Sequence, residues 1–574
     1  MRVLWSFTVL CLIALSGCGG GSAPTQPGTV ISGSGSPGAP DAGSPDAGSP
    51  SDAVTPDGGS PVDAGSPDGG SPVDAGSPDG GSPIDAGSPD GGSPVDAGAP
   101  DGGSSPDAGS PPDAGSPDGG SPPDAGPSAA GGGDWPQYRH GITGTSLNPG
   151  TFAKSEVANL TPLWTAELGQ YVYTQPILSG GVAIFTTAYT GRVVALDAAT
   201  GQQLWSRDLN LAITTSCDVP QKTGFWASVA VVGDLVYAAS PDGHLYALRK
   251  SDGSTVWASA IANPTPSGNG EQLVASPAVS VALGKLFMGV AASSDKTCGY
   301  IPGRIVAVDL ASGASSSKTL VDPGQTGAPA WSSISVDEPA GLVYASTGDV
   351  FNANGGSEPL SQAIVAFKAS DLSVVSHWQN PTPLTDADFG ASPTLFAAAD
   401  GTPLVAAASK DGWLYVLDRR NLAAGPVWRY RLAQSVDPTD PNKVGDPVAG
   451  QGSIVSPSFA NGTLYAAGGI TPAGEPGSVL AFEPGSGATK WKHVTPGYLI
   501  AAVAAVGEIL VVESSSLDFK QGWIEILDAS TGAALRTFDP GSAVFAAPTV
   551  GRGLILFANQ NGNVTALAVP HYRP

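Results

Sequence analysis

Short runs of alternating apolar and polar residues recur along residues 134–574 and predict β-strands. One run is Leu235-Val236-Tyr237-Ala238-Ala239, and the turn Ser240-Pro241-Asp242-Gly243 separates it from a second run, His244-Leu245-Tyr246-Ala247-Leu248. Two strands joined by an Asp-Gly turn are typical of a β-hairpin. Because no helical periodicity accompanies these runs, we expect an all-β fold for this part of the chain.

A longer phrase follows each predicted hairpin and returns, with weaker and shifted copies, at intervals of roughly 40–65 residues. Its first full copy reads Ala195-Leu196-Asp197-Ala198-Ala199-Thr200-Gly201-Gln202-Gln203-Leu204-Trp205. The Asp-x-x-Thr-Gly part predicts a tight turn in which Gly supplies a positive φ, and the Trp predicts a further strand. Three or four short strands per unit are typical of a propeller blade. We count eight units and predict an eight-bladed β-propeller.

The two ends of the repeat region complement each other. The last copy ends at Thr565-Ala566-Leu567-Ala568 without a Trp strand, whereas Pro162-Leu163-Trp164-Thr165-Ala166-Glu167-Leu168 is a Trp strand that precedes the first copy. We expect this N-terminal strand to complete the last blade and close the ring, which leaves no open sheet edge.

Residues 1–17 are predicted to be an export signal. Arg2 precedes an apolar run from Val3 to Leu15, and Leu15-Ser16-Gly17-Cys18 follows. The ending resembles the lipobox of bacterial lipoproteins, which implies that Cys18 is lipidated and becomes the first mature residue. Gly19 does not resemble the aspartate that retains such proteins in the inner membrane. We therefore expect a lipid-anchored protein of the cell envelope, on either face of the outer membrane.

Residues 18–133 are predicted to be a disordered tether rich in Ser, Pro, Asp and Gly. The stretch 22–133 holds 16 Asp residues and no Lys, Arg, Glu or aromatic residue, so it cannot bury enough apolar surface to fold. These aspartates explain most of the formal net charge of −25. The negative charge therefore lies mainly in the tether, and it is not evidence about a ligand.

The cysteines and histidines of residues 134–574 exclude several kinds of site. Cys217 and Cys298 are the two cysteines of this region, and we expect them to form a disulfide in an oxidising compartment. No Cys-x-x-Cys-His motif for c-type haem is present, and five scattered His residues give no zinc constellation. The sequence also lacks a nucleophile elbow, a phosphate-binding loop and a basic patch, so hydrolase and nucleic-acid-binding functions are not indicated.

The start of the repeat region resembles a known enzyme family. Asp134-Trp135-Pro136-Gln137-Tyr138-Arg139-His140 and Val157-Ala158-Asn159-Leu160-Thr161-Pro162-Leu163-Trp164 are similar to the N-terminus of quinoprotein alcohol dehydrogenases, and the polyvinyl-alcohol dehydrogenase branch is the most similar. These enzymes are eight-bladed propellers that hold pyrroloquinoline quinone (PQQ) and usually Ca²⁺. The resemblance covers residues 134–570.

The resemblance implies a PQQ-dependent oxidoreductase that oxidises a small or polymeric alcohol. Electrons would pass to an external acceptor, a cytochrome or a quinone, because the chain has no haem motif. The repeat phrase also occurs in non-catalytic lipoprotein propellers of the outer-membrane assembly machinery. A protein-binding scaffold of the cell envelope therefore stays the alternative function.

Four positions carry the site that the resemblance implies. Trp331, in Pro329-Ala330-Trp331-Ser332-Ser333, matches the tryptophan that forms the floor under the quinone ring. Asp349 follows Ser346-Thr347-Gly348, where the family has an Asn that binds calcium. Asp388, in Asp386-Ala387-Asp388-Phe389-Gly390, matches the catalytic base beside the metal, and Asp386 is the reserve candidate. Lys410, which opens Lys410-Asp411-Gly412-Trp413-Leu414-Tyr415, matches the cation that contacts the quinone oxygens.

Three departures from the family pattern affect the same site. Where the family often has adjacent cysteines, this chain reads Ser216-Cys217-Asp218-Val219. The arginine that meets a quinone carboxylate has no clear counterpart, and Lys222 is the candidate to replace it. The calcium-binding Glu is also missing from the loop Asp295-Lys296-Thr297-Cys298-Gly299-Tyr300, in which Asp295 is the candidate ligand.

Overall fold

The computed structural model describes residues 133–149, 152–169, 171–209, 212–216, 219–264, 270–292, 301–349, 358–381, 384–437 and 440–570. Cys18, Cys217, Asp295 and Cys298 lie outside these ranges, so the expected lipidation, disulfide and third metal ligand stay predictions. Lys222 lies on β8 (Val219–Thr223), of which the backbone is described. In the described ranges no helix has the length and apolar character needed to cross a membrane.

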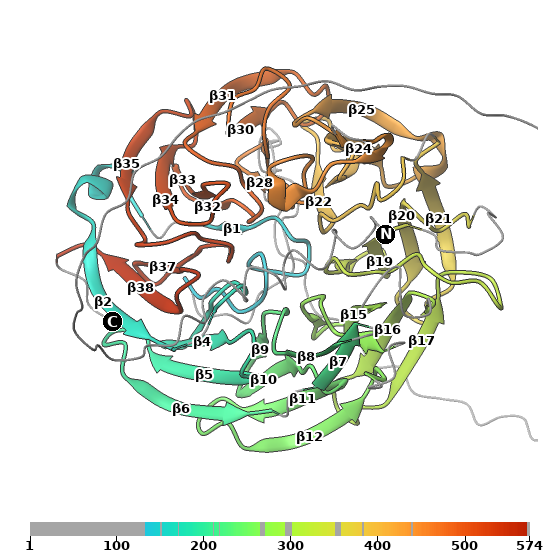
Figure 1. Ribbon diagram of the computed structural model, residues 1–574, viewed down its shortest axis with the longest axis horizontal. Helices are drawn as coiled ribbons and strands as arrows, with labels where there is room; N and C mark the ends of the chain where they lie inside the picture. Colours follow the sequence, from blue (N-terminus) through green and yellow to red (C-terminus); the bar gives the residue numbers. More distant parts are fainter. Residues whose placement is uncertain are drawn as a thin grey trace, which may run out of the picture. The chain divides into compact units, whose positions relative to one another are not determined.

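Eight antiparallel sheets form the blades of a propeller around a ring (Figure 1). This confirms the predicted all-β, eight-bladed fold. The first four blades in chain order are β3 (Ile177–Ser179), β4 (Val182–Thr186), β5 (Arg192–Asp197) and β6 (Gln203–Asp208); β9 (Ala230–Val232), β10 (Leu235–Ala239), β11 (His244–Arg249) and β12 (Thr255–Ala260); β14 (Ala278–Ser280), β15 (Lys285–Ala292), β16 (Arg304–Asp309) and β17 (Ser315–Thr319), extended by β13 (Glu271–Gln272); and β18 (Ser335–Asp337), β19 (Leu342–Ser346), β20 (Ala363–Lys368) and β21 (Val374–Gln379).

Blades five to eight repeat the same order. They are β22 (Thr394–Ala397), β23 (Pro403–Ala408), β24 (Trp413–Asp418) and β25 (Pro426–Arg431); β28 (Ser458–Ala460), β29 (Thr463–Gly468), β30 (Gly477–Phe482) and β31 (Thr489–Thr495); β32 (Ala504–Val506), β33 (Ile509–Ser515), β34 (Gly522–Asp528) and β35 (Ala534–Phe538), with β1 (Leu147–Asn148) added; and β36 (Thr549–Gly551), β37 (Leu554–Ala558), β38 (Asn563–Ala568) and β2 (Thr161–Glu167). Two hairpins lie between blades, namely β7 (Ala212–Ser216) with β8, and β26 (Val436–Asp437) with β27 (Asp440–Val444). Three short 3₁₀ helices are η2 (Lys154–Asn159), η3 (Leu422–Ala424) and η4 (Pro447–Ala449).

Strand direction sorts the loops onto two faces. In blades one to seven the chain runs from a short inner strand outward through three antiparallel neighbours, and in blade eight β2 supplies the outer strand. The loop that enters the inner strand and the turn between the second and third strands must therefore lie at the same end of the blade. We call this end the upper face.

The N-terminal strand closes the ring as predicted. β2 pairs antiparallel with β38, and the pairing runs from Thr161 opposite Ala568 to Glu167 opposite Asn563. The last blade thus takes its outer strand from the start of the propeller sequence, and the two ends of the ring are joined by a hydrogen-bonded ladder.

The repeated Trp and Gly of the sequence phrase form a joint between neighbouring blades. The indole of Trp205, on the outer strand of the first blade, donates a hydrogen bond to the carbonyl of Lys250 at 2.7 Å in the second. Its ring lies over Gly253, where a Cβ would meet Trp205 Cε3 at 2.6 Å. Gly253 has φ +70°, so this position needs glycine both for its backbone and for the ring. Trp164 joins Gly201 in the same way.

A segment that we call the thread, residues 135–148, contacts the inner strand of every blade in succession. Its partners in blade order are Leu178, Val231, Val279, Val336, Leu395, Phe459, Ala505 and Val550. Most of these bonds join main-chain groups, for example Val231 N to Pro136 O at 2.7 Å and Leu395 N to Thr143 O at 2.9 Å. The thread ends as β1, beside β32 near the centre of the ring (Figure 1). It therefore holds the inner edges of all eight blades together.

Arg139 anchors the thread to blades five and six. Its side chain is buried, and the guanidinium donates to the carbonyls of Ser392 and Pro393 at 3.1 Å and of Pro457 at 2.8 Å. It also donates to Gly144 O and Thr394 Oγ1. Burial lowers the pKa of Arg139 to about 10, which leaves the guanidinium charged at neutral pH.

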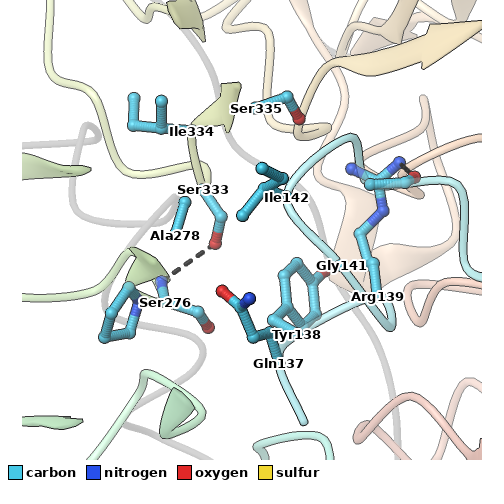
Figure 2. A pocket seen from close by; sticks show the side chains of 12 residues that line it. Gln137, Tyr138, Arg139, Gly141, Ile142, Ser276, Ala278, Ser333, Ile334 and Ser335 are labelled. Carbon is cyan, nitrogen blue, oxygen red and sulfur yellow. Dashed lines mark hydrogen bonds between the residues drawn. The ribbon is translucent and has the colours of Figure 1, made fainter. Parts of the chain in front are cut away.

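A relay of serines connects the loops that enter inner strands. The amide of Ser276 donates to Ser333 Oγ at 2.9 Å, a bond drawn in Figure 2, where both serines line a small pocket beside Gln137 and Arg139 of the thread. The same bond joins Ser333 N to Ser392 Oγ and Ser392 N to Ser456 Oγ, each at 2.9 Å. Ser228 N in blade two donates to Ser276 Oγ at 3.0 Å, so the relay spaces the loops of blades two to six on the upper face.

Candidate active site

The structure brings Trp331, Asp349, Asp388 and Lys410 together on the upper face. Trp331 and Asp388 lie in the loops that enter β18 and β22, and Asp349 and Lys410 follow β19 and β23. Neighbouring blades four and five thus supply all four residues. The serine relay fixes the two entering loops relative to each other, because Ser333 and Ser392 follow Trp331 and Asp388 closely in sequence.

Lys410 lies at the centre of this group. Its Nζ is 2.8 Å from Asp386 Oδ1 and 2.8 Å from Asp388 Oδ2, and it stands 5.4 Å from the centroid of the Trp331 ring. Lys410 is only 5% exposed. Burial by itself would lower the pKa of Lys410, but the charges of Asp386 and Asp388 outweigh burial and raise it. The ammonium is therefore a fixed positive charge.

The carboxylate of Asp388 accepts three hydrogen bonds. Asp349 N donates to Oδ1 at 2.7 Å, and Lys410 Nζ and Trp331 Nε1 donate to Oδ2 at 2.8 and 3.2 Å. A carboxylate has about four lone-pair positions, so Oδ1 retains one position for a further donor. Three fixed donors orient this group, and the remaining position can receive the hydroxyl proton of a substrate.

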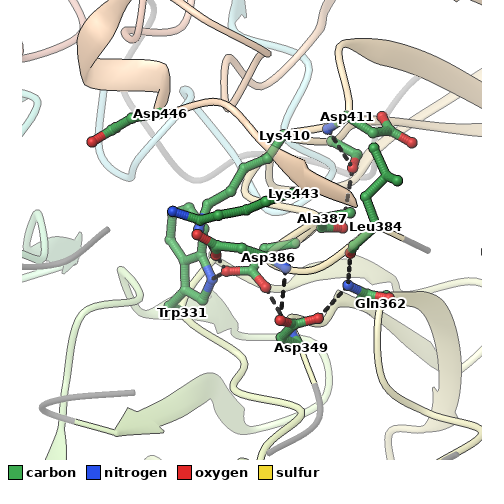
Figure 3. A network of polar contacts seen from close by, with 12 residues as sticks. Trp331, Asp349, Gln362, Leu384, Asp386, Ala387, Lys410, Asp411, Lys443 and Asp446 are labelled. Atoms are coloured by element: carbon green, nitrogen blue, oxygen red, sulfur yellow. Dashed lines mark hydrogen bonds and ion pairs between the residues drawn. The ribbon is translucent and has the colours of Figure 1, made fainter. Parts of the chain in front are cut away.

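Asp349 connects the two loops of the site. Its Oδ2 accepts a bond from Asp386 N at 2.7 Å, and its Oδ1 accepts one from Gln362 Nε2 (Figure 3). Gln362 also donates to Leu384 O at 3.0 Å. Gln362 was not singled out from the sequence, because nothing in its local pattern shows that it reaches across to another loop.

Two glycines make room for the packing of the site. A Cβ at Gly348 would lie 2.7 Å from Asp388 Oδ1, and a Cβ at Gly390 would lie 2.4 Å from the Trp331 ring. Both distances are too short for a side chain. Each glycine therefore permits the close approach of blades four and five.

The hairpin β26–β27 supports the loop that carries Asp386 and Asp388. Thr385 N donates to Asn442 O at 3.0 Å, and Val444 N donates to Thr385 O at 3.1 Å. Asp386 itself has φ +68°, which a non-glycine residue adopts only where its surroundings enforce it. The hairpin thus helps to hold the loop in an unusual conformation beside Lys410.

Lys443 and Asp446 extend the site beyond the residues predicted from the sequence. Figure 3 shows Asp446 on the far side of Lys410 from Asp349. Asp446 Oδ1 caps η4 by accepting Val448 N at 2.9 Å. Burial raises the pKa of Asp446, and the charge of Asp386 raises it further, whereas Lys410 and Lys443 act against this rise. The loop after blade five therefore brings both a cation and an acid to the site.

Asp386, Asp388 and Lys410 are not surface residues. Asp386 and Asp388 are 3% and 4% exposed, so they are not the solvated loop aspartates that their spacing alone would favour. Lys410 is equally far from being a surface lysine of a blade turn.

The residues of the site are suited to bind a flat cofactor, but they do not by themselves form a complete metal-binding site. Trp331 is half-buried and lies beside a fixed ammonium, which suits a planar ring with oxygen substituents. Asp349 and Asp388 supply hard carboxylate oxygens of the kind that Ca²⁺ binds. Within the described ranges, no three His, Cys, Asp or Glu side chains are grouped so that they could hold one metal ion. A bound metal would need further donors.

Comparison with known proteins places these residues within one family match. A family model described as the β-propeller domain of glucose, ethanol and alcohol dehydrogenases, named for PQQ, matches residues 135–423, just over half of the chain. Trp331, Asp349, Asp388 and Lys410 all lie in this range.

Several quinoproteins are among the relatives and solved structures to which the chain is similar. The quinoprotein alcohol dehydrogenase PedH of Pseudomonas putida is 25% identical over 69% of this chain and 80% of its own length. The quinohemoprotein alcohol dehydrogenase ADH IIB of Pseudomonas putida is 26% identical over 53% of this chain, a match that spans about half of that relative (49%). The crystal structure of a quinohemoprotein alcohol dehydrogenase from Comamonas testosteroni aligns with a TM-score of 0.58 at 19% identity, covering 77% of this chain and 81% of that one. A europium-containing methanol dehydrogenase aligns with a TM-score of 0.58 at 17% identity, covering 75% of this chain and 88% of that one. At these identities the two structures support the fold.

Proposed function

The chain belongs to the PQQ-type β-propeller family of glucose, ethanol and alcohol dehydrogenases, and on this premise we propose that it is an oxidoreductase that oxidises an alcohol with PQQ and passes the electrons to an external acceptor. The observation that carries the proposal is the single hydrogen-bonded network of Trp331, Asp349, Asp388 and Lys410. The relatives named above support it, since their names describe alcohol dehydrogenases.

Asp388 is the general base of the proposed reaction. An alcohol hydroxyl can donate its hydrogen bond to the remaining position on Oδ1 and transfer its proton there as the carbon is oxidised. The bonds from Asp349 N, Lys410 and Trp331 hold the carboxylate still while this happens. Because these donors are fixed by the blades, little reorganisation is needed at the moment of proton transfer.

Lys410 is the electrostatic stabiliser of the site. Its ammonium stands 5.4 Å from the centroid of the Trp331 ring. It is therefore next to the space that a planar group stacked on this ring would occupy. A buried cation at that distance favours negative charge that develops on an oxygen of such a group. Asp386 orients the ammonium through its own ion pair.

The cofactor assignment rests on the Trp331 ring and on the carboxylates of Asp349 and Asp388. When bound, PQQ and Ca²⁺ would supply the two-electron acceptor and the Lewis acid of the reaction. Trp331 would support the ring, and Lys222 would meet a carboxylate of the cofactor. Asp349 would hold the metal, and Asp295 is the proposed additional donor. Asp388 would join them in exchange for one of its present donors, because its one remaining position receives the substrate hydroxyl.

The first prediction tests the base. In the full chain loaded with PQQ and Ca²⁺, we expect Asp388→Asn to lower kcat for alcohol-dependent dye reduction by about 10²- to 10⁴-fold, because the amide cannot accept the proton. Saturable change of the PQQ absorbance should remain. Asp371→Asn is the control, since Asp371 is an exposed loop aspartate whose Oδ1 accepts from Ser373 N at 2.9 Å, away from the site. Equal activity of the two variants would contradict the assignment, and absence of any PQQ binding by the parent chain would overturn the proposed function.

We also propose that a lipid on Cys18 holds the protein in the cell envelope, with residues 18–133 as the tether. The signal-like pattern of residues 1–18 supports this proposal. Mass spectrometry of the N-terminal peptide should find a diacylglyceryl group, and Cys18→Ala should move the protein from the membrane fraction to the soluble fraction. An unmodified Cys18 would refute it.

A further inference from the structure

One position recurs on the upper face of every blade. It is the residue four places before the inner strand, and we call the eight residues at this position the collar. The blades are equivalent units around one ring, so the members of the collar follow one another around that ring (Figure 1). In blade order they are Tyr173, Trp226, Val274, Trp331, Gly390, Ile454, Ile500 and Phe545. Gly390 is buried and the other seven are half-buried.

Successive members of the collar pack against each other. Tyr173 and Phe545, from blades one and eight, have ring centroids 5.7 Å apart. In blades four to six the arrangement differs, because a Cβ built on Gly390 would lie 2.4 Å from Cη2 of Trp331 and 2.5 Å from Cγ2 of Ile454. Since both atoms lie so near one point, Trp331 of blade four and Ile454 of blade six are close neighbours, with no side chain of blade five between them.

Trp331 is held at both of its rings. Nε1 of the five-membered ring donates to Asp388 Oδ2 at 3.2 Å. Cη2, which is the atom near Ile454, belongs to the six-membered ring. The χ2 torsion of an aromatic side chain is soft, so packing must set the plane of the indole. A ring that is held at one end can tilt about its hydrogen bond, and Ile454 supplies the second constraint that prevents this.

The loop that carries Ile454 is fastened to blade five on both sides of this residue. Gly452 packs so closely against Lys410 that a Cβ there would lie 2.2 Å from the carbonyl oxygen of Lys410. Beyond Ile454, Ser456 Oγ accepts the hydrogen bond from Ser392 N at 2.9 Å. Isoleucine is also β-branched, and such side chains have few accessible χ1 rotamers. The backbone and the side chain of Ile454 are therefore both fixed relative to the site.

We propose that Ile454 is a positioning residue of the alcohol oxidation, which fixes the plane of Trp331 and, through Nε1, the carboxylate of Asp388. The inference rests on the proposed function, because it takes Asp388 as the base of that reaction. Ile454 has no group that can transfer a proton or an electron, so its effect must pass through the indole. A smaller side chain at this position would leave the six-membered ring of Trp331 without this neighbour.

Hydrogen exchange at the indole N–H of Trp331 tests this role without turnover. Its resonance in the full, cofactor-free chain is assigned by its loss in Trp331→Phe. We expect Ile454→Ala to speed the exchange by about tenfold, because a tilting ring releases Asp388 more often, and Ile454→Val to stay near the parent. Ile500→Ala is the matched control, since Ile500 is the half-buried isoleucine of the collar in blade seven. It should lower the melting temperature to a similar extent and leave this exchange unchanged.

Rates measured on the chain loaded with PQQ and Ca²⁺ separate this inference from the proposed function. We expect Ile454→Ala to lower kcat by about tenfold with little change in KM, and Ile500→Ala to keep both. Faster exchange in Ile454→Ala, in a protein that oxidises no alcohol, would support the positioning of Trp331 and refute the dehydrogenase. If the parent oxidises alcohol and the two alanine variants have equal exchange and equal kcat, the dehydrogenase stands and the inference is overturned. Faster exchange with an unchanged kcat would also overturn it.

Discussion

Single side chains of this protein acquire their chemistry from burial. Lys410, Asp386 and Asp388 would be ordinary polar residues on a blade turn and a loop, yet they are 5%, 3% and 4% exposed and paired with one another. In such a place each charge is stable only because its partners are present. Activity and stability therefore depend on the same contacts.

Removal of the cation should expose this dependence. We expect Lys410→Met to lower the stability of the fold by about 3–5 kcal/mol, because two buried carboxylates lose their shared counter-charge. Adding Asp386→Asn and Asp388→Asn to that variant should restore part of the loss. Lys520→Met is the control, since Lys520 pairs with Asp518 but has a side chain that is 83% exposed, and it should cost about 1 kcal/mol or less. Thermal denaturation of the four proteins gives the comparison, and a Lys410→Met variant as stable as Lys520→Met would contradict it.

Glu513, on β33, is a second buried ionisable group, and no function is proposed for it. It is 2% exposed, and in the described part of the chain neither carboxyl oxygen has a hydrogen-bond partner. Burial raises the pKa of Glu513 well above its usual value. Above about pH 4.3 the unfolded chain releases this proton while the folded chain retains it, so the free energy of unfolding falls as the pH rises toward the folded pKa.

Glu513→Gln should remove that pH dependence. We expect the melting temperatures of the variant and the parent to be similar near pH 4 and to diverge toward pH 8, with the variant more stable. Differential scanning calorimetry across this range measures the divergence. Glu508→Gln serves as the control, because Glu508 is exposed and should leave the pH profile unchanged. If the melting temperature of the parent does not fall relative to that of Glu513→Gln as the pH rises, ionisation of this carboxyl does not destabilise the fold.

The sequence could locate the main site residues but not their supports. Trp331, Asp349, Asp388 and Lys410 lie in stretches that match a family pattern, and the structure brings them together. Gln362 was missed because its role depends on a contact between two loops. Asp446 lies at the edge of a loop whose conformation no local pattern specifies. Roles that arise from loop packing cannot be read from spacing along the chain.

At the scale of elements, the propeller is assembled from one repeated joint. At six of the joints, the Trp of an outer strand and a glycine of the next blade are separate positions in the sequence, and the structure shows that they are two halves of one contact. The outer strands β17 and β35 carry no Trp. The periodicity therefore predicted the blades because the same contact must recur between them. The hairpin β26–β27 has no such repeat, and its support of Thr385 could not be foreseen.

A pair of glycine substitutions can separate the two reasons why this joint needs glycine, namely the positive φ and the close approach of the Trp ring. We expect Gly253→Ala to destabilise the protein by clearly more than Gly233→Ala. Both positions have positive φ, +70° and +57°, so both variants incur a strain of about 1 kcal/mol. Only at Gly253 would the new Cβ also meet the Trp205 ring, whereas nothing lies within 4 Å at Gly233. Urea denaturation of the two variants measures the difference, and equal losses would mean that the ring moves aside freely.

At the scale of the whole molecule, the thread and the strand exchange join residues that are far apart in sequence. The closing pair β2–β38 was predicted from the missing Trp strand of the last repeat. The thread was not predicted from the sequence. Its hydrogen bonds are mainly between main-chain groups, and such bonds leave no pattern of residue types in the sequence. Arg139 is its one conspicuous side chain, and a buried arginine cannot be distinguished from an exposed one in an isolated sequence.

Arg139→Met should loosen the inner ring as a unit. The carbonyl groups of Ser392 and Gly144 would lose their donor, and each unsatisfied buried group costs about 1–3 kcal/mol. We expect faster amide hydrogen exchange at Val336, Leu395 and Phe459, whose amides bond to the thread. Arg420→Met is the control, since Arg420 is an exposed partner of Asp418. Unchanged exchange at these three amides would show that the thread holds its place without the guanidinium.

The thread also affects the order in which contacts can form while the chain is being synthesised. A ribosome makes residues 135–148 before any blade exists, and the last inner strand that they contact, β36, appears some four hundred residues later. Until then these first residues have only part of their eventual set of partners. Each blade that is completed adds one partner in turn, from Leu178 to Val550. The earliest part of the propeller to be synthesised is thus the last to have its neighbours complete, and a nascent chain that stops short of β38 leaves both ends of the ring open.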